Sequence, residues 1–200
     1  MANLDNPFGL RPVRHLNGMP WNGQTQRCLM ASGVAVNAYV GDAVVRAGTS
    51  NVDGTCPTIT IATMGDANPV YGVITGFEPD GNYPNQVYRT TATNRYCYVC
   101  IDPDVIYHIQ DDGVAVIGIT GSALSANLIQ THAGSTVSGR SQMELKADTV
   151  AANASFQLFI LNAAPIEGND ATIARAIWEV LISQHQLRTA IATGGILGIA

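Results

Sequence analysis

Residues 96–113 read YCYVCIDPDVIYHIQDDG and show the pattern that decides the fold. Two runs of apolar, β-branched and aromatic residues flank an Asp-Pro-Asp turn, and the second run ends at Asp-Asp-Gly. Short runs of this kind, bounded by turn residues, are typical of β-strands. We therefore predict two strands, over residues 96–101 and 105–110, joined by a short turn.

The same pattern extends outward from this pair in both directions. Short apolar runs end at Gly-Asp, Ala-Gly or Pro-Asp-Gly, which is tight-turn chemistry. Their regular spacing predicts one mainly β domain, built as a sandwich or a barrel. The further predicted strands are residues 34–36, 38–40, 43–45, 58–62, 70–77, 86–90, 140–145, 156–161 and 175–182.

One stretch in the middle of the chain departs from the strand pattern. Leu124, Leu128 and Ile129 lie four and five residues apart, and Ser122 precedes them as a candidate helix cap. Residues 121–131 are therefore predicted to form one short helix.

The two ends differ from the β domain, which we place at residues 28–188. Residues 1–27 contain three prolines, which break helices and strands, so this segment is predicted to be an extended arm. The arm carries apolar and basic side chains, so it is expected to lie on a surface, on its own domain or on a partner. Residues 189–200 are apolar, Gly-rich and free of charge, and they are also expected to dock on the chain's own core or on a neighbour.

Charge is scarce in this chain and is unequally divided between residue types. Charged residues make up 12% of the sequence, against about 25% in an average domain. A surface with little charge suits a protein that partners cover, because interface centres are depleted in Lys, Glu and Asp. The cations are nine Arg and one Lys, Lys146, which fits either an interface protein or the codon bias of a GC-rich genome.

Several functional classes are disfavoured by charge and hydropathy. The net charge of −5 argues against general binding to nucleic acid, which needs a basic face. No stretch of about 18 apolar residues is present, so no membrane span is expected. The first sixteen residues lack the apolar core of a secretory signal, so folding in a cytoplasm and free thiols are expected.

The residues that could carry chemistry have ordinary structural interpretations. Cys97 and Cys100 have a C-x-x-C spacing, but positions three apart on a strand face opposite sides, so a shared metal is not expected. The four histidines are widely scattered. No nucleotide-binding, zinc-protease or nucleophile-elbow motif occurs. We therefore expect no catalytic residue, no metal and no cofactor.

Residues 6–14 read NPFGLRPVR and are the first of several segments with a shared pattern along the chain. They look like the opening of a family of virion structural proteins from tailed bacteriophages, and further matches follow in order. The apolar segment 189–200 is not part of this pattern. The other matching segments are residues 73–77, 99–104, 139–145 and 180–187.

The resemblance implies a head decoration, or cement, protein. Such proteins bind the outside of an assembled capsid, commonly as trimers, and use β-barrel or jelly-roll domains with extended arms. By this resemblance the protein is not an enzyme, its partners are the major capsid protein and its own copies in a homotrimer, and it is located in the virion. The expected fold is an all-β sandwich or jelly-roll-like barrel, and the expected capsid contacts of the arm are Phe8, Leu10, Arg11, Arg14 and Trp21.

Two alternatives remain at this point. The chain is either another virion component, from the tail, neck or minor capsid, or a carbohydrate-binding or hydrolytic β domain. In the second alternative, aspartates would bind a cation and aromatic side chains would stack on sugar rings. The same aspartates also suit turns, and the same aromatic residues also suit a hydrophobic core. The candidate residues of this alternative are Asp102, Asp104, Asp111, Asp112, Tyr71, Tyr83, Tyr96 and Trp178.

Overall fold

A computed structural model describes residues 3–188 of the chain, and it is mainly β, as predicted. Two 3-10 turns, η1 (Ile119–Gly121) and η2 (Ala147–Thr149), and a short helical turn at residues 186–188 accompany the strands. The predicted docking of residues 189–200 lies outside the described residues. The strands are β1 (Arg11–His15), β2 (Gln26–Met30), β3 (Ala43–Ser50), β4 (Pro57–Ile61), β5 (Gly72–Phe77), β6 (Arg95–Cys100), β7 (Val105–Gln110), β8 (Ser125–Ala126), β9 (Leu128–Ile129), β10 (Glu144–Leu145), β11 (Leu158–Ala163) and β12 (Ile177–Ile182).

The first half of the chain forms a closed barrel in the order β2-β4-β3-β5-β6. Strands β2 and β4 pair in parallel, and every other neighbour pair in the barrel is antiparallel. A closed barrel has no open sheet edge, so its backbone groups pair all the way round. Its interior is filled by small and β-branched side chains, including Cys28, Met30, Val44, Ile59 and Ile74.

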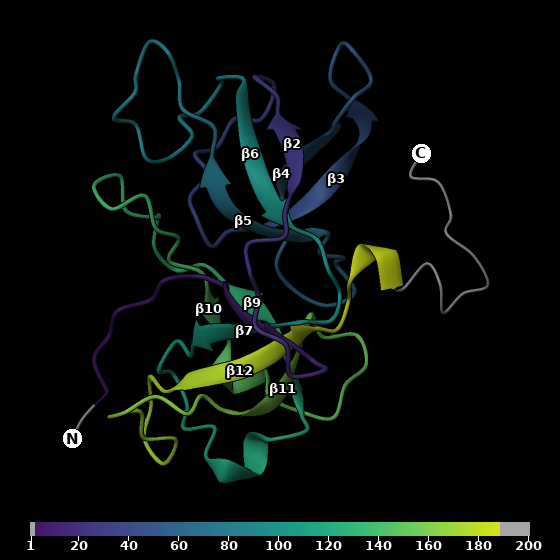
Figure 1. The fold of residues 1–200 in the computed structure, drawn as a ribbon. Helices are drawn as coiled ribbons and strands as arrows, with labels where there is room; N and C mark the ends of the chain where they lie inside the picture. Colours follow the sequence, from purple (N-terminus) through teal and green to yellow (C-terminus); the bar gives the residue numbers. More distant parts are fainter. Residues whose placement is uncertain (1–2, 189–200) are drawn as a thin grey trace.

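The second half forms a five-stranded antiparallel sheet in the order β1-β7-β12-β11-β8, and β9 pairs separately with β10. Alternate residues of β7 (Val105, Tyr107 and Ile109) point to the core, as the two-residue period of a strand requires. The same core contains Val73 and Cys100 from the barrel strands. The barrel and the sheet therefore share one apolar core and lie directly against each other (Figure 1).

The N-terminal segment contributes strand β1 to the sheet and the first two residues of strand β2 to the barrel. Strand β1 pairs with β7 at the edge of the sheet, with an irregularity between Pro12 and Arg14, and β2 belongs to the barrel. Proline is tolerated at a sheet edge and at bulges, because no ladder hydrogen bond from its nitrogen is needed there. This explains why a segment with three prolines still contains strands.

The predicted helix over residues 121–131 is wrong. This stretch contains the two short strands β8 and β9, which pair with β11 and β10. Ser122 has an extended backbone (φ −61°, ψ 138°), and Ala123 has a positive φ of 65°, which a right-handed helix cannot contain. Strand pairing with distant segments has therefore outweighed the weak helix signal in the spacing of Leu124, Leu128 and Ile129.

Candidate interaction surface

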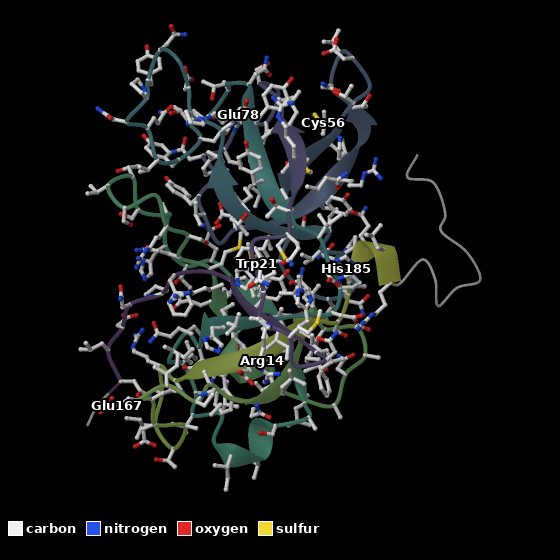
Figure 2. The ribbon with its side chains drawn as sticks, viewed as in Figure 1. Arg14, Trp21, Cys56, Glu78, Glu167 and His185 are labelled. Atoms are coloured by element: carbon white, nitrogen blue, oxygen red, sulfur yellow. The ribbon has the colours of Figure 1, made fainter. Side chains whose placement is uncertain are left out.

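The five predicted arm contacts have different surroundings in the structure. Leu10 is buried in the shared core, and its backbone N–H donates to the Gly41 carbonyl at 2.9 Å. Trp21 packs against the same core and lies between the barrel and the sheet (Figure 2). Arg11 is exposed, Phe8, Arg14 and Trp21 are half-buried, and of the five only Leu10 is fully buried. Capsid binding by these residues stays a prediction.

Arg14 belongs to a polar group on the face of the sheet that is opposite to the core. Its guanidinium contacts a carboxylate oxygen of Glu179 at 2.8 Å, and the side-chain amide of Asn162 donates to the same oxygen at 2.9 Å. Nε2 of His108 lies 3.5 Å from the other oxygen. Burial, as the largest cause, lowers the pKa of His108, although Glu179 opposes this shift. The group ties β1, β7, β12 and β11 together, so Arg14 has a structural role within its own chain.

The two cysteines of the C-x-x-C sequence point into different cores. Cys97 lies in the barrel interior, and Cys100 lies in the core shared with the sheet. Burial raises the pKa of both thiols, so they are protonated at neutral pH. All four cysteines of the chain are buried and free.

Of the four candidate acids, two accept hydrogen bonds from the backbone and two pair with basic side chains. Asp111 is fully buried, and its carboxylate accepts hydrogen bonds from the backbone N–H groups of Gly113, Arg175 and Ala176 and from Trp178 Nε1. Asp112, also buried, accepts hydrogen bonds from the backbone N–H groups of Val114 and Ala147. Asp102 lies 3.1 Å from His15, and Asp104 pairs with Arg188. Each acid therefore stabilises a turn or an ion pair.

These acids do not converge on a common point. Within residues 3–188, no three His, Cys, Asp or Glu side chains are arranged to hold a metal ion. His15, Leu16, Met19 and Asp104 line a surface hollow of about 530 Å³ that is open to solvent. The titratable side chains of its lining are paired, His15 with Asp102 and Asp104 with Arg188, and the side-chain oxygens of Asn17 and Gln24 accept hydrogen bonds from nearby backbone N–H groups.

The four aromatic candidates do not form a common platform either. Tyr71 and Trp178 are buried in the two cores. Tyr96 is covered by Arg27, whose guanidinium carbon lies 3.6 Å from the ring centroid. Tyr83 is exposed on the loop between β5 and β6. A surface on which sugar rings could stack is therefore not assembled by these residues.

Exposed apolar side chains are concentrated on the loops. Among the large apolar residues that are exposed within residues 3–188, only Tyr98 belongs to a strand. Val52, at the β3–β4 turn, is 98% exposed, and Val137, on the loop before β10, is 90% exposed. Such side chains on turns are not needed for the fold. Val52 and Val137 were not predicted from the sequence, and the signal that could have found them is a valine within a run of turn residues.

The loops at one end of the barrel are held in place from inside by Arg89. This side chain is fully buried, and its guanidinium donates hydrogen bonds to the backbone carbonyls of Ala31, Val34, Val36 and Thr93. Burial lowers the pKa of Arg89. The predicted strands at residues 34–40 and 86–90 are therefore wrong: these segments are loops that wrap round a buried cation and share a single bridge, between Ala38 and Arg89.

Comparisons with protein-family models, with curated proteins and with solved structures found no match. Within the described residues, no helix is long and apolar enough to cross a membrane.

Proposed function

We propose that this chain is a non-enzymatic phage structural protein that decorates the head and works by binding other protein surfaces. The observation that carries the binding role is the set of exposed apolar side chains on loops of a surface poor in charge. Interface centres are apolar and depleted in charge, so this surface suits a protein partner. The identity of that partner, the major capsid protein, rests on the family resemblance of the sequence.

The end of the barrel that is remote from the sheet is the surface that we propose to face the capsid. Two loops extend there, the β3–β4 turn with Val52 and the β5–β6 loop with Tyr83 (Figure 1). Arg89 fixes the neighbouring loops before any partner binds, which reduces the entropy that is lost on binding. A homotrimer would add to the affinity, because several such ends would bind one lattice at once.

The sandwich or jelly-roll-like description of the fold belongs to the same proposal. It is supported by the core that the barrel and the sheet share, because two packed β layers around one core are the basis of sandwich folds.

The test is co-sedimentation with undecorated heads assembled from the major capsid protein of the same phage. Wild-type protein should bind saturably. Val52→Asp combined with Tyr83→Asp should weaken binding by about tenfold or more, because charge at a buried interface centre is costly. The matched control is Glu167→Ala, since Glu167 is exposed on a loop of the other half.

A second pair of variants separates the barrel end from the arm. Phe8→Ser with Arg11→Glu changes two partly or fully exposed arm residues and leaves the Arg14–Glu179 pair and the core contact of Trp21 intact. Loss of binding in this pair alone would move the contact from the barrel end to the arm. Absence of binding by the wild-type protein would contradict decoration, and a few copies in each particle would favour a tail or neck position instead.

A further inference from the structure

An apolar patch of Val114, Val116 and Ile119 lies on the irregular segment between β7 and η1. These side chains are 69%, 56% and 76% exposed. The residues between them behave differently, because Ile117 is buried and Ala115 packs against the shared core. The contacts of Ala115 and Ile117 with the core therefore hold the segment in place, and its three other aliphatic side chains are exposed to solvent.

The backbone of this patch is also without partners in the described part of the chain. From Ala115 to Ile117, no N–H and no carbonyl takes part in a hydrogen bond within residues 3–188. These residues are not in a strand, but their free backbone groups can donate hydrogen bonds to, and accept them from, a segment that covers the neighbouring aliphatic side chains. We call this backbone the template.

Nothing in the local sequence protects this template from other chains. Residues 113–139 contain no Asp, Glu, Lys, Arg or Pro. Native β proteins usually protect exposed backbone with charged residues or proline, and a patch that lacks both is expected to be covered.

We propose that residues 189–200 of this chain, TAIATGGILGIA, cover the patch. This segment carries no charge and contains Ile191, Ile196, Leu197 and Ile199. Aliphatic side chains on both sides remove apolar surface from water together, and no charged group is desolvated. The same match would allow the segment to come from a second copy.

The segment is long enough to reach the patch within one chain. Arg188, the last residue before it, is held by an ion pair with Asp104. Asp104 and Val114 are ten residues apart across β7, so they are separated by at most about 34 Å. Twelve further residues can span about 40 Å.

The first test uses amide hydrogen exchange in the full chain. Replacing the aliphatic residues of the segment, by Ile196→Asp with Ile199→Asp, should accelerate exchange at Ala115, Val116 and Ile117 by about tenfold or more, because their cover is lost. The control, Val52→Asp, adds a charge at a fully exposed valine on the β3–β4 turn and should leave exchange at these amides unchanged.

The second test is a cross-link that also identifies the source of the segment. Val116→Cys with Leu197→Cys should form a disulfide under mild oxidation, within one chain or between two copies. A non-reducing gel separates these two results, and both support the proposal. The control pair, Val52→Cys with Leu197→Cys, should not react.

Two results would overturn the proposal, and neither depends on capsid binding. One is unchanged exchange at Ala115–Ile117 in the Ile196→Asp, Ile199→Asp protein. The other is obtained with Val116→Cys alone, in which Leu197 is unchanged. If this variant forms a disulfide between two copies as readily as the double variant reacts, the patches of two copies cover each other.

Discussion

The N-terminal segment and the Val114–Ile119 patch are both irregular in sequence, yet they are attached to the molecule in opposite ways. Residues 3–15 are held by many directional contacts. Asn3 donates to the carbonyl of Asp170, Gln110 Nε2 donates to the Leu4 carbonyl at 2.7 Å, and Arg14 pairs with Glu179. Residues 115–117 have no hydrogen bond within the described chain and are held only by Ala115 and Ile117 in the core.

Amino-acid composition alone therefore does not show whether an irregular segment is a free arm or an integral part of the fold. Residues 3–15, which are rich in polar residues and proline, belong to the folded structure because their side chains contact buried groups. The apolar segment stays open, because its outward residues find none within residues 3–188. Buried Leu10 and the paired charged and amide side chains fix residues 3–15 to their own chain, whereas the exposed aliphatic residues of the patch have no partner within residues 3–188.

The largest expected effect is on the stability that the N-terminal segment contributes. Leu10→Ala leaves a cavity in the shared core, so the free energy of unfolding should fall by about 2–5 kcal/mol in urea denaturation. Leu4→Ala, in the same segment but 82% exposed, should change it by less than about 0.5 kcal/mol. Equal effects would mean that the segment is not anchored through Leu10.

The next effect is a pH dependence at Asp42, beside the point where the N-terminal segment crosses Gly41. Burial raises the pKa of Asp42 to about 6 from 3.8. The folded state therefore binds this proton more tightly, and the contribution of Asp42 to the free energy of unfolding increases as pH falls from above 6 towards 4. The full contribution is about 3 kcal/mol.

His185 opposes this trend over a similar pH range. It is buried at the junction of barrel and sheet, and burial lowers its pKa to about 4 from 6.5 (Figure 2). The folded state therefore resists protonation, and stability is lost as pH falls from 6.5 towards 4. The two effects should nearly cancel in the wild-type protein. Relative to the wild-type protein, Asp42→Asn should lose stability on acidification and His185→Gln should gain it, as measured by urea denaturation at pH 7 and pH 4.5.

A smaller effect is expected at the ion pair that fixes β1 to the sheet. Glu179→Gln removes the charge that faces Arg14, and should lower the free energy of unfolding by about 1–3 kcal/mol because Glu179 is buried. It should also lower the pKa of His108 further, which NMR titration can follow. Glu78→Gln, at the exposed pair with Arg27, is the control and should have less effect than Glu179→Gln.

The smallest effect is expected at the patch itself. Val116→Ala should lower the free energy of unfolding by about 1 kcal/mol or less, because the side chain is 56% exposed and only the proposed cover by residues 189–200 would remove the rest of it from water. Thermal unfolding of the two proteins at equal concentration provides the comparison. A loss as large as that of Leu10→Ala would show that the patch belongs to the fold in the same way as the N-terminal segment.

The strands were predictable where one local pattern agreed with the tertiary pairing. Strand β7 has the predicted bounds, since Val105, Tyr107 and Ile109 alternate with residues of the opposite face. Strand β6 begins one residue before its predicted start and also ends one residue early. The opposite orientation of Cys97 and Cys100 follows from the same alternation.

Other features depend on contacts between residues that are distant in sequence. Strand β1 exists because β7 offers an edge, and the loops near residue 89 exist because Arg89 binds four carbonyls that are up to 58 residues away. The closed order of the barrel, with β2 parallel to β4, has no local signature. Neither the exposure of Val116 nor the burial of Leu10 could be inferred from residue type.

We propose that this chain binds a repeating capsid lattice through the loops at the remote end of the barrel, while residues 3–15 stay on their own sheet. A cryo-EM map of the native particle would show both features at once. We expect the chain on the outside of the head, in a fixed ratio to the major capsid protein, with the Val52 and Tyr83 loops against the capsid and Leu10 still in its own core. The protein absent from the head, or residues 3–15 withdrawn from β7 and bound to the capsid, would contradict it.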